Sequence, residues 1–476
     1  MLVSGGRLAA ALMALVTIRA VTTFLTPEQY GALALLIAVQ TFCGFFLVNP
    51  VGQHINLHTH AWWDDGTLMA RLKSYRRYIF AVSLVGCVVV IGMGRHLSVE
   101  QVLWSAVAMF VMVVAGTWNA TLISLLNMVG FRAASILWTI ITGAVGLVGS
   151  ILLCIWFPSA IAWFAGQALG MTAGALGARY VLRKQATQLN FSQTALPLLD
   201  RNAILTYCLP LALATGLMWL QLSGYRFLIE VYWGLAQLGL VAIGLNLAGQ
   251  VWSLAESLAM QFLNPLFYRR ISEHENLVEV ELAFSDLLNT LVPVYFVLAG
   301  SLVLGAPYLL KILVAPKFQD AIVFVMLGSG IELCRVLGNI LSNAAHARRK
   351  TISLALPYAA GAIVSLVLIY IVAVCQMGVM WAGAALIIGA MAMLMVMWFG
   401  MRRQVNFKID FARWAWGLAF IFAVPAFVTW IPKVSGMGIA IAMLVLVAIP
   451  SGVAMLTLLW KNPAMLRLLN VQLRNN

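Results

Sequence analysis

The chain has 476 residues, of which 63% are hydrophobic and only 9% are charged. Because a soluble protein of this length needs polar side chains to cover its surface, the composition excludes a soluble globular protein and predicts an exterior that faces lipid. The formal net charge of +14 is then expected in the cytoplasmic loops of a membrane protein, and we expect no nucleic-acid partner.

Common nucleotide-binding and zinc-binding motifs are missing from the sequence. It contains neither GxxxxGK[ST], the phosphate-binding loop, nor HExxH, a zinc-binding helix motif. The six cysteines lie inside or at the ends of apolar runs and at no motif spacing. We interpret them as small buried residues rather than as disulfides or zinc ligands. The sequence therefore predicts no metal and no bound cofactor.

Fourteen segments are apolar enough and long enough to cross a bilayer, which takes about 20 residues of helix. They predict an all-α polytopic membrane protein with about 14 transmembrane helices. The connections between them are short, and the longest, 51–77 and 183–203, are too small to be soluble domains. The segments are residues 4–25, 30–50, 78–94, 99–126, 131–157, 159–182, 204–223, 236–267, 283–305, 319–345, 351–375, 378–400, 413–431 and 437–460.

The first segment, GGRLAAALMALVTIRAVTTFL at residues 5–25, contains two arginines and no acidic residue. Because Arg19 interrupts its apolar run and no A-x-A cleavage site follows, we interpret it as a transmembrane helix rather than a signal peptide. Arg7 and Arg19 lie about 18 Å apart along a helix axis and point about 120° apart. Each either reaches toward the membrane surface or binds an anion, and the guanidinium fork suits phosphate.

The stretch HINLHTHAWWDD, residues 54–65, follows the second segment. His54 and His58 have the spacing of one helical turn, and two aspartates follow, which raises the alternative of a metal site. The order of these residues matches no tight zinc pattern. We predict an interfacial cytoplasmic loop in which Trp62 and Trp63 anchor the chain at the lipid surface.

The basic residues are distributed unevenly between the two sides of the predicted membrane. With the N-terminus in the cytoplasm, 21 of the 29 Lys and Arg residues fall in inner loops, at inner helix ends or in the C-terminal tail. Five fall on the outer side, and three lie within helices. This asymmetry predicts that both termini are cytoplasmic, which requires an even number of helices.

An internal similarity suggests that the chain contains a repeat. EQYGALALLIA at 28–38 is similar to AQLGLVAIGLN at 236–246, an offset of 208 residues. An even number of helices in each half keeps both halves in one orientation, which predicts a parallel repeat around a central cavity. The predicted parts are a six-helix lobe, a cytoplasmic linker, a second six-helix lobe, and two extra helices with a tail: residues 1–184, 185–202, 203–403 and 404–476.

The eighth segment, 236–267, has a polar strip roughly 80° wide. Lipid cannot bond such a strip, so it faces either another helix, as a polar seam, or a water-filled cavity, and the length of the strip favours the cavity. Glu256 lies beside it, either as a coupling carboxylate or as the partner of an arginine. The strip consists of Asn246, Gln250, Ser253, Ser257, Gln261 and Asn264.

The tenth segment, 319–345, has polar residues within roughly 100° of one another at its C-terminal end. Glu332 and Arg335 are three residues apart and can pair. They form either a structural ion pair or an ion-responsive gate. The polar residues are Glu332, Arg335, Asn339, Ser342, Asn343 and His346.

Three tracts resemble a known family. FLTPEQYGALALL at 24–36 is similar to the Leu-Gly-Pro-Glu-x-Tyr-Gly-x-x-x-Leu signature of polysaccharide (O-antigen type) flippases, with Thr26 where glycine is usual. The tracts YCLPLALATGLMWLQLSGYRFLIE at 207–230 and APYLLKILVAPKFQDAIVFVMLGSGIELCRVLGN at 306–339 resemble the same family. These flippases belong to the multidrug/oligosaccharidyl-lipid/polysaccharide exporter superfamily, here called the MOP superfamily.

The resemblance implies a function as well as a fold. It implies two six-helix lobes around a central cavity that works by alternating access, in the bacterial inner membrane. It also implies flipping of an undecaprenyl-pyrophosphate-linked oligosaccharide, in a pathway with a polysaccharide polymerase and glycosyltransferases. We expect Arg7, Arg19, Asn246, Gln250 and Gln261 to bind this substrate. For coupling to a proton or sodium ion, or for gating, we expect Glu256, Glu332, Arg335 and Asn339.

Two alternatives come from other classes. An ion-coupled drug exporter of the same superfamily is disfavoured because the first six helices have no acidic residue at mid-span, and a cationic first helix suits an anionic substrate better. A membrane glycan polymerase or ligase is disfavoured because no outer loop exceeds about 15 residues, too short for a catalytic loop. We therefore expect a transporter rather than an enzyme.

Overall fold

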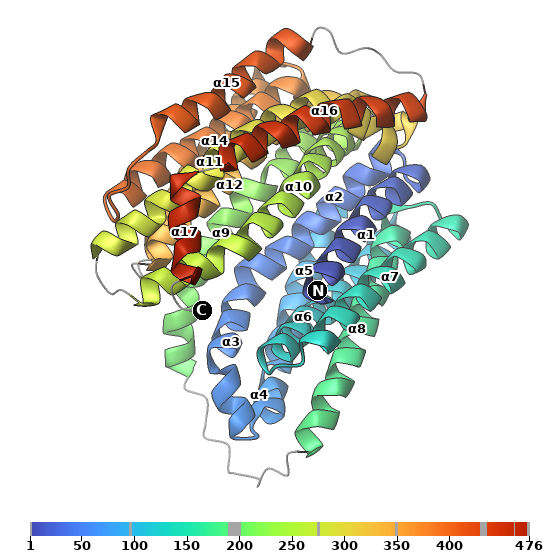
Figure 1. Ribbon diagram of the computed structural model, residues 1–476. Coiled ribbons are helices and arrows are strands. Elements are labelled where there is room, and N and C mark those ends of the chain that lie inside the picture. Colours follow the sequence, from blue (N-terminus) through green and yellow to red (C-terminus); the bar gives the residue numbers. More distant parts are fainter. Residues whose placement is uncertain are drawn as a thin grey trace. The chain divides into compact units, whose positions relative to one another are not determined.

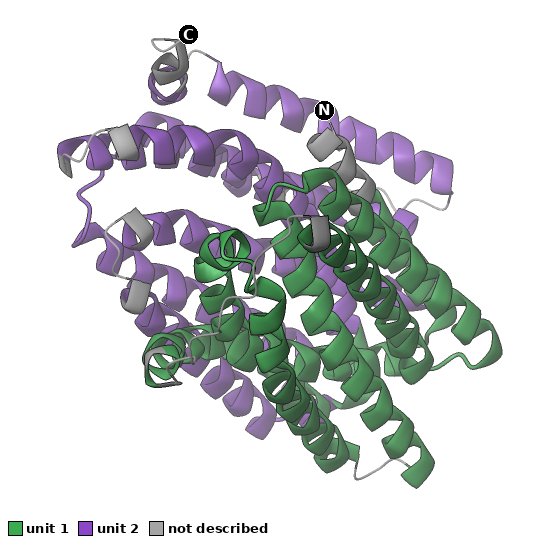
Figure 2. Ribbon diagram, turned by 90° about the horizontal axis from the view of Figure 1, so that it is seen from below, with its two compact units in different colours: residues 1–230, 234–239 green, residues 231–233, 240–476 purple. Residues whose placement is uncertain are grey.

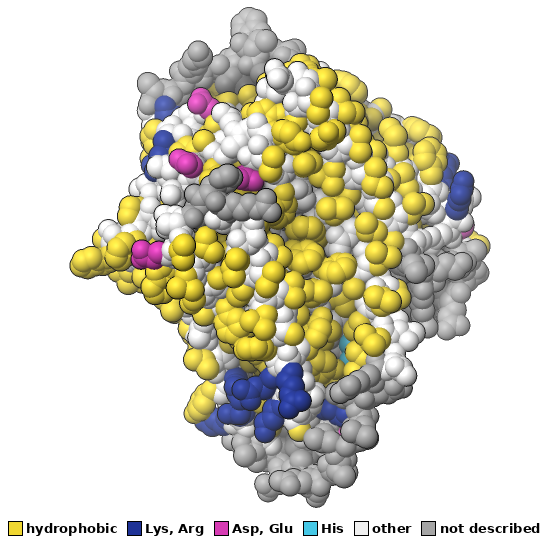
Figure 3. Space-filling model, turned by 180° about the vertical axis from the view of Figure 1, so that it is seen from behind, with side chains coloured by type: hydrophobic (Ala, Val, Ile, Leu, Met, Phe, Trp, Pro, Cys, Tyr) yellow, Lys and Arg dark blue, Asp and Glu magenta, His cyan; other side chains and the backbone are white. Residues whose placement is uncertain are grey.

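The protein is a multi-pass membrane protein, and its described residues form helices and no strand (Figure 1). A computed structural model describes residues 2–94, 98–188, 201–273, 277–347, 351–428, 436–460 and 462–473. Within these residues, ten stretches are long and apolar enough to cross a membrane. Hydrophobic side chains cover much of the face seen in Figure 3, as expected for a surface in contact with lipid.

All fourteen predicted segments are helical. The ten stretches are fewer because residues 204–271 form one stretch that covers two segments. The first and thirteenth segments appear among the shorter apolar helices. The sixth segment lies in α8 (Ala160–Gln188), whose many glycines make it less apolar.

The chain divides into two compact units, coloured separately in Figure 2. Unit 1 comprises residues 1–230 and 234–239, and unit 2 comprises residues 231–233 and 240–476. The elements of unit 1 are α1 (Leu2–Phe24), α2 (Pro27–Phe42), the π-helical segment η1 (Cys43–Val48), α3 (Asn49–Asp64), α4 (Leu68–Ser74), α5 (Arg76–Met93), α6 (Val99–Met128), α7 (Arg132–Trp156), α8, α9 (Arg201–Ser223) and the start of α10 (Tyr225–Glu273).

Unit 2 contains the rest of α10. This helix bends at Gly234, whose backbone φ of 82° is a conformation that glycine adopts much more readily than other residues. Its core is formed by large side chains of α10 and α11, among them Trp252, Phe284 and Tyr295. The further elements are α11 (Leu277–Leu313), η3 (Pro316–Ala321), α12 (Ile322–Ala347), η4 (Thr351–Leu354), α13 (Ala355–Val374), α14 (Val379–Arg402), α15 (Phe411–Val428), α16 (Met437–Leu459) and α17 (Pro463–Leu473).

Contacts place α9 in unit 1. The Thr215 hydroxyl donates to the Phe45 carbonyl at 2.7 Å, and the Trp219 indole donates to the Ala38 carbonyl at 3.1 Å. The predicted lobes, 1–184 and 203–403, are defined by the internal sequence repeat, whereas the two units are defined by contacts within the structure. The lobe boundaries therefore remain a prediction.

Residues 54–64 are helical, so the prediction of a loop there is wrong, whereas their place at the lipid surface remains a prediction. Pro50 has no N–H, so the α-helical bond to residue 46 cannot form, and the backbone widens into η1 instead of ending. The helix then continues as α3, in which His54 and Trp62 are buried and the ring centroids of His54 and His58 lie 4.5 Å apart. No group of three His, Cys, Asp or Glu residues in the described ranges could hold a metal ion.

Residues 27–31 and 235–239, at the start of the two similar segments, pack against each other within unit 1. A Cβ atom added to Gly31 would overlap the Leu235 carbonyl, and one added to Gly239 would overlap the Pro27 carbonyl. Adding the repeat offset of 208 to 27 and 31 gives 235 and 239. The contact is therefore reciprocal, as at a two-fold axis, which supports the predicted internal repeat.

Two polar residues of α11 hold the C-terminal elements in unit 2. Buried Asp286 accepts hydrogen bonds from Arg270 and Arg467, each at 3.0 Å. Asn289 bonds both the Asp410 backbone N–H at 2.9 Å and the Trp414 indole at 3.1 Å. The segment leading into α15 is thus tied to α11, and so is α17.

Candidate functional site

Four predicted coupling residues meet in unit 2. Glu332, Arg335 and Asn339 are spaced by three and four residues, so α12 presents them on one face, and Glu256 comes from α10. Arg335 contacts Glu332 at 2.6 Å and Glu256 at 3.0 Å. The Asn339 amide donates to the other Glu256 oxygen at 2.7 Å. We call these four residues the charged cluster.

The charged cluster confirms the expected Glu332–Arg335 ion pair and shows that Glu256 is an arginine partner. Its three charged side chains are only 17–21% exposed. Two carboxylates face one guanidinium, so the cluster has an excess negative charge whenever both carboxyls are ionised. Such an excess in a poorly hydrated place favours uptake of a proton or a cation. The coupling or gating role itself remains a prediction.

Tyrosines lie near the charged cluster. Tyr295 and Tyr358 are within electrostatic range of Glu256 and Arg335. Among the described residues, the buried Tyr295 hydroxyl has no hydrogen-bond partner, although buried polar groups normally have one.

The polar strip of α10 faces away from the core of unit 2. Trp252 and Phe267 on the same helix are fully buried, whereas Asn246 and Ser253 are exposed and Gln261 is half-buried. The Gln250 amide contacts the Asn246 side chain at 3.4 Å. The unit 2 core does not enclose the strip, as expected for a face that meets water or another part of the protein.

The two arginines of α1 belong to unit 1. Arg19 is half-buried, and its carbonyl accepts hydrogen bonds from the Thr22 and Thr23 hydroxyls at 3.1 and 2.7 Å. Arg7 lies in the same helix, but its side chain is outside the described residues, and so is that of His346. Binding of an anion by these arginines remains a prediction.

Unit 1 contains a pocket that sequence analysis missed. It has a volume of about 470 Å³ and lies among α2, η1, α3 and α6. Among the described residues, its lining contains many amides and hydroxyls and no charged side chain. We call it the neutral pocket, and its polar lining residues are Gln40, Thr41, Asn49, Gln53, Asn56, Thr117, Asn119, Thr121 and Ser124.

The spacing of polar residues along two helices could have predicted the neutral pocket. Thr117, Thr121 and Ser124 recur at intervals of four and three residues in α6, a predominantly apolar helix. Asn49, Gln53 and Asn56 repeat the same intervals on α3. The second series was missed because residues 51–77 were expected to be a loop, where such spacing has no meaning.

Comparison with solved structures identifies the fold. The chain is similar to a lipid II flippase, MurJ, in an inward closed conformation, with a TM-score of 0.69, 11% identity, and coverage of 95% of this chain and 97% of the other. This chain has the fold of MOP-superfamily transporters. No family model matches the sequence, and no curated protein matches it.

Transporters of a second kind share the MOP fold. An inward-facing multidrug resistance MATE family transporter of the MOP superfamily aligns with a TM-score of 0.52 and 14% identity, over 87% of this chain and 96% of the other. A MATE protein in a bent conformation aligns with a TM-score of 0.54 and 12% identity, over 88% and 93%. In this MOP fold, the neutral pocket lies in unit 1 and the charged cluster in unit 2.

Proposed function

We propose that this protein flips an undecaprenyl-pyrophosphate-linked oligosaccharide from the cytoplasmic to the outer leaflet of a bacterial inner membrane, by alternating access, for surface polysaccharide synthesis. The fold supports this proposal, because the chain aligns over nearly its whole length with a protein named as a lipid flippase. The distribution of Lys and Arg supports cytoplasmic termini.

The neutral pocket is the observation that carries the proposal. Sugars present many hydroxyls and no charge, so they are bound by amides and hydroxyls that both donate and accept hydrogen bonds. The neutral pocket supplies nine such side chains, in a volume of about 470 Å³. A pocket for a cationic drug would need a carboxylate, and none lines it.

The pyrophosphate is assigned to α1. Arg7 and Arg19 are the charged side chains of this helix, which has no acidic residue. A guanidinium donates two parallel hydrogen bonds to a phosphate and keeps its charge in a poorly hydrated setting. In this proposal the charged cluster couples transport to a proton or a sodium ion.

The charged cluster favours a second candidate function, an ion-coupled exporter of small molecules. Its two carboxylates give it the excess negative charge that a coupling ion needs. The fold shared with a multidrug resistance MATE family transporter supports the same function.

Reconstituted transport distinguishes the two candidates. Proteoliposomes would be supplied with an undecaprenyl-pyrophosphate oligosaccharide, whose outward exposure is read, and with a cationic dye as the competing substrate. Thr121→Val removes a hydroxyl from the neutral pocket, and Thr139→Val makes the same change on the exposed side of α7. We expect glycolipid flipping that Thr121→Val lowers and Thr139→Val leaves unchanged. Movement of the dye alone would favour the exporter.

A further inference from the structure

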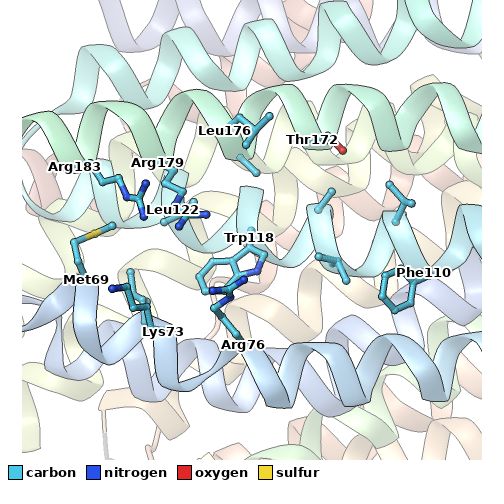
Figure 4. A pocket seen from close by; sticks show the side chains of 15 residues that line it. Met69, Lys73, Arg76, Phe110, Trp118, Leu122, Thr172, Leu176, Arg179 and Arg183 are labelled. Atoms are coloured by element: carbon cyan, nitrogen blue, oxygen red, sulfur yellow. The ribbon is translucent and has the colours of Figure 1, made fainter.

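A second pocket of unit 1 combines four positive charges with an apolar trough (Figure 4). It has a volume of about 480 Å³ and lies among α4, α5, α6 and α8. Lys73, Arg76, Arg179 and Arg183 gather at one end, beside Trp118 (Figure 4). We call this site the basic pocket; neither the proposed function nor the neutral pocket uses it.

Local sequence explains why the charges meet. Arg179 and Arg183 are four residues apart in the last turns of α8, so they share one face of that helix. Lys73 lies at the end of α4 and Arg76 begins α5, only a tight turn away. All four were expected on the cytoplasmic side of the membrane, and the fold brings them to one place.

The charged side chains that line the basic pocket are all positive. No salt bridge in the described part of the chain involves Lys73, Arg76 or Arg179. Arg183 and Arg76 both act on Arg179 as like charges. Like charges held together in this way are stabilised by an anion, and phosphate matches the geometry of guanidinium groups.

Apart from Thr172, the rest of the basic pocket is apolar, and it is open to the side. Along α6 it runs from Trp118 to Phe110, about 12 Å at the rise of an α-helix. Val111 and Leu176, which line it, are 38% and 63% exposed. A soluble phosphate would leave this trough empty, whereas a lipid would fill it with an acyl chain.

We propose that the basic pocket binds an anionic phospholipid of the bilayer, with its phosphate against Arg76, Arg179 and Lys73 and one acyl chain along the trough toward Phe110. Positive pockets between transmembrane helices on the cytoplasmic side recognise such headgroups. This lipid is distinct from the transported substrate, and its site lies wholly within unit 1.

Native mass spectrometry of the purified full-length protein tests this assignment, with phosphatidylglycerol and phosphatidylcholine as probes. We expect phosphatidylglycerol to be retained in preference to phosphatidylcholine. The triple variant Lys73→Gln, Arg76→Gln, Arg179→Gln should bind phosphatidylglycerol about a hundredfold more weakly, since each of the three cations near a membrane surface contributes roughly fivefold. Equal retention of phosphatidylglycerol by the triple variant and the wild type would overturn the assignment.

A matched control removes the same charge elsewhere. Arg132, Arg402 and Arg403 are exposed and lie outside the basic pocket, so their triple change to Gln should leave phosphatidylglycerol binding unchanged. Arg179→Lys keeps the charge but loses the planar fork, so binding should fall less than with Arg179→Gln. If both triple variants lose phosphatidylglycerol equally, net charge rather than the basic pocket is responsible, and the proposal fails.

Competition separates the other sources of a phosphate group. Inorganic pyrophosphate should not displace phosphatidylglycerol, because it makes no contact with the trough. Displacement by pyrophosphate would identify a site for a soluble phosphate instead. Displacement by undecaprenyl phosphate at an equal concentration would identify a site for the substrate's carrier lipid. Either result would overturn the assignment to a bilayer phospholipid.

Discussion

The charged cluster of unit 2 and the basic pocket of unit 1 hold their charges in opposite ways. In the charged cluster, Arg335 bonds two carboxylates, and Asn339 bonds one of them. In the basic pocket, Lys73, Arg76 and Arg179 have no carboxylate partner among the described residues. The charged groups of the first site bond one another within the protein, whereas those of the second site require an anion from outside.

The difference follows from position along the helices. Glu332 and Arg335 lie near the middle of the membrane-crossing stretch Pro316–Ala345, where an unpaired charge is costly, and they find charged partners within α12 and on α10. Lys73 and Arg76 lie near the start of another such stretch, Leu68–Met93, and Arg179 is in the last turns of α8. Water or lipid phosphates can balance charges at such ends. The two groups therefore predict different responses to mutation.

The largest effect is expected for Arg335→Leu, which leaves two carboxylates facing each other. We expect the free energy of unfolding to fall by about 3 kcal/mol, because removing one partner of a buried ion pair strands the other charge. Thermal unfolding in detergent measures this loss. Adding Glu256→Gln and Glu332→Gln to Arg335→Leu should restore most of the stability. No restoration would show that Arg335 stabilises unit 2 through packing rather than charge.

A tenfold effect on transport is expected when Arg19, a cation of α1, is replaced. Arg19→Ala should lower flipping of the undecaprenyl-pyrophosphate oligosaccharide about tenfold, since a charge-assisted hydrogen bond contributes about 1.5 kcal/mol or more. Arg19→Lys should restore part of the activity, because the charge remains but the fork is lost. The readout is flipping in proteoliposomes at equal protein content. Wild-type flipping by Arg19→Ala would exclude the anion role.

A smaller loss of stability is expected for Asn339→Ala, which removes the amide that donates to Glu256. The free energy of unfolding should fall by about 1.5 kcal/mol, the contribution of a hydrogen bond to a charged group. Ser342→Ala is the control on the same helix, because the Ser342 hydroxyl bonds only the Asn339 carbonyl of its own turn. Thermal unfolding should separate the two variants. Equal losses would mean that the amide adds nothing to the cluster.

The smallest effect on stability is expected in the basic pocket. In lipid-free detergent, the change of Lys73, Arg76 and Arg179 to Gln should alter the free energy of unfolding by no more than about 0.5 kcal/mol. Removing like charges also relieves the repulsion around Arg179. The comparison of the two sites breaks down if this triple variant unfolds as readily as Arg335→Leu.

Much of the fold was predictable because lipid imposes simple rules. A segment that crosses a bilayer must be helical and apolar, so the helices in the fourteen predicted segments could be read from hydrophobic runs. The Glu332–Arg335 pair was also predictable, because residues three apart on a helix are neighbours. The contact of Glu256 with Arg335 joins residues 79 positions apart, and its geometry depends on how α10 packs against α12.

The remaining features depend on contacts between distant segments. Composition marked residues 51–77 as a loop because they are polar, but Pro50 only widens the helix at η1, and the buried face of α3 supports its continuation. The neutral pocket followed from that continuation, since its lining comes from α3 as well as α6.

By itself, the sequence determined the membrane class, the helices, the sidedness expected from Lys and Arg, and the local pairing on α12. Each of these depends on hydropathy or on spacing within one helix. Only the tertiary structure decided which polar residues share a pocket and which cations find a partner. It also decided that Gly31 and Gly239 make a reciprocal contact. The physical reason is that these features depend on how helices distant in sequence pack, and periodicity within one helix does not encode that packing.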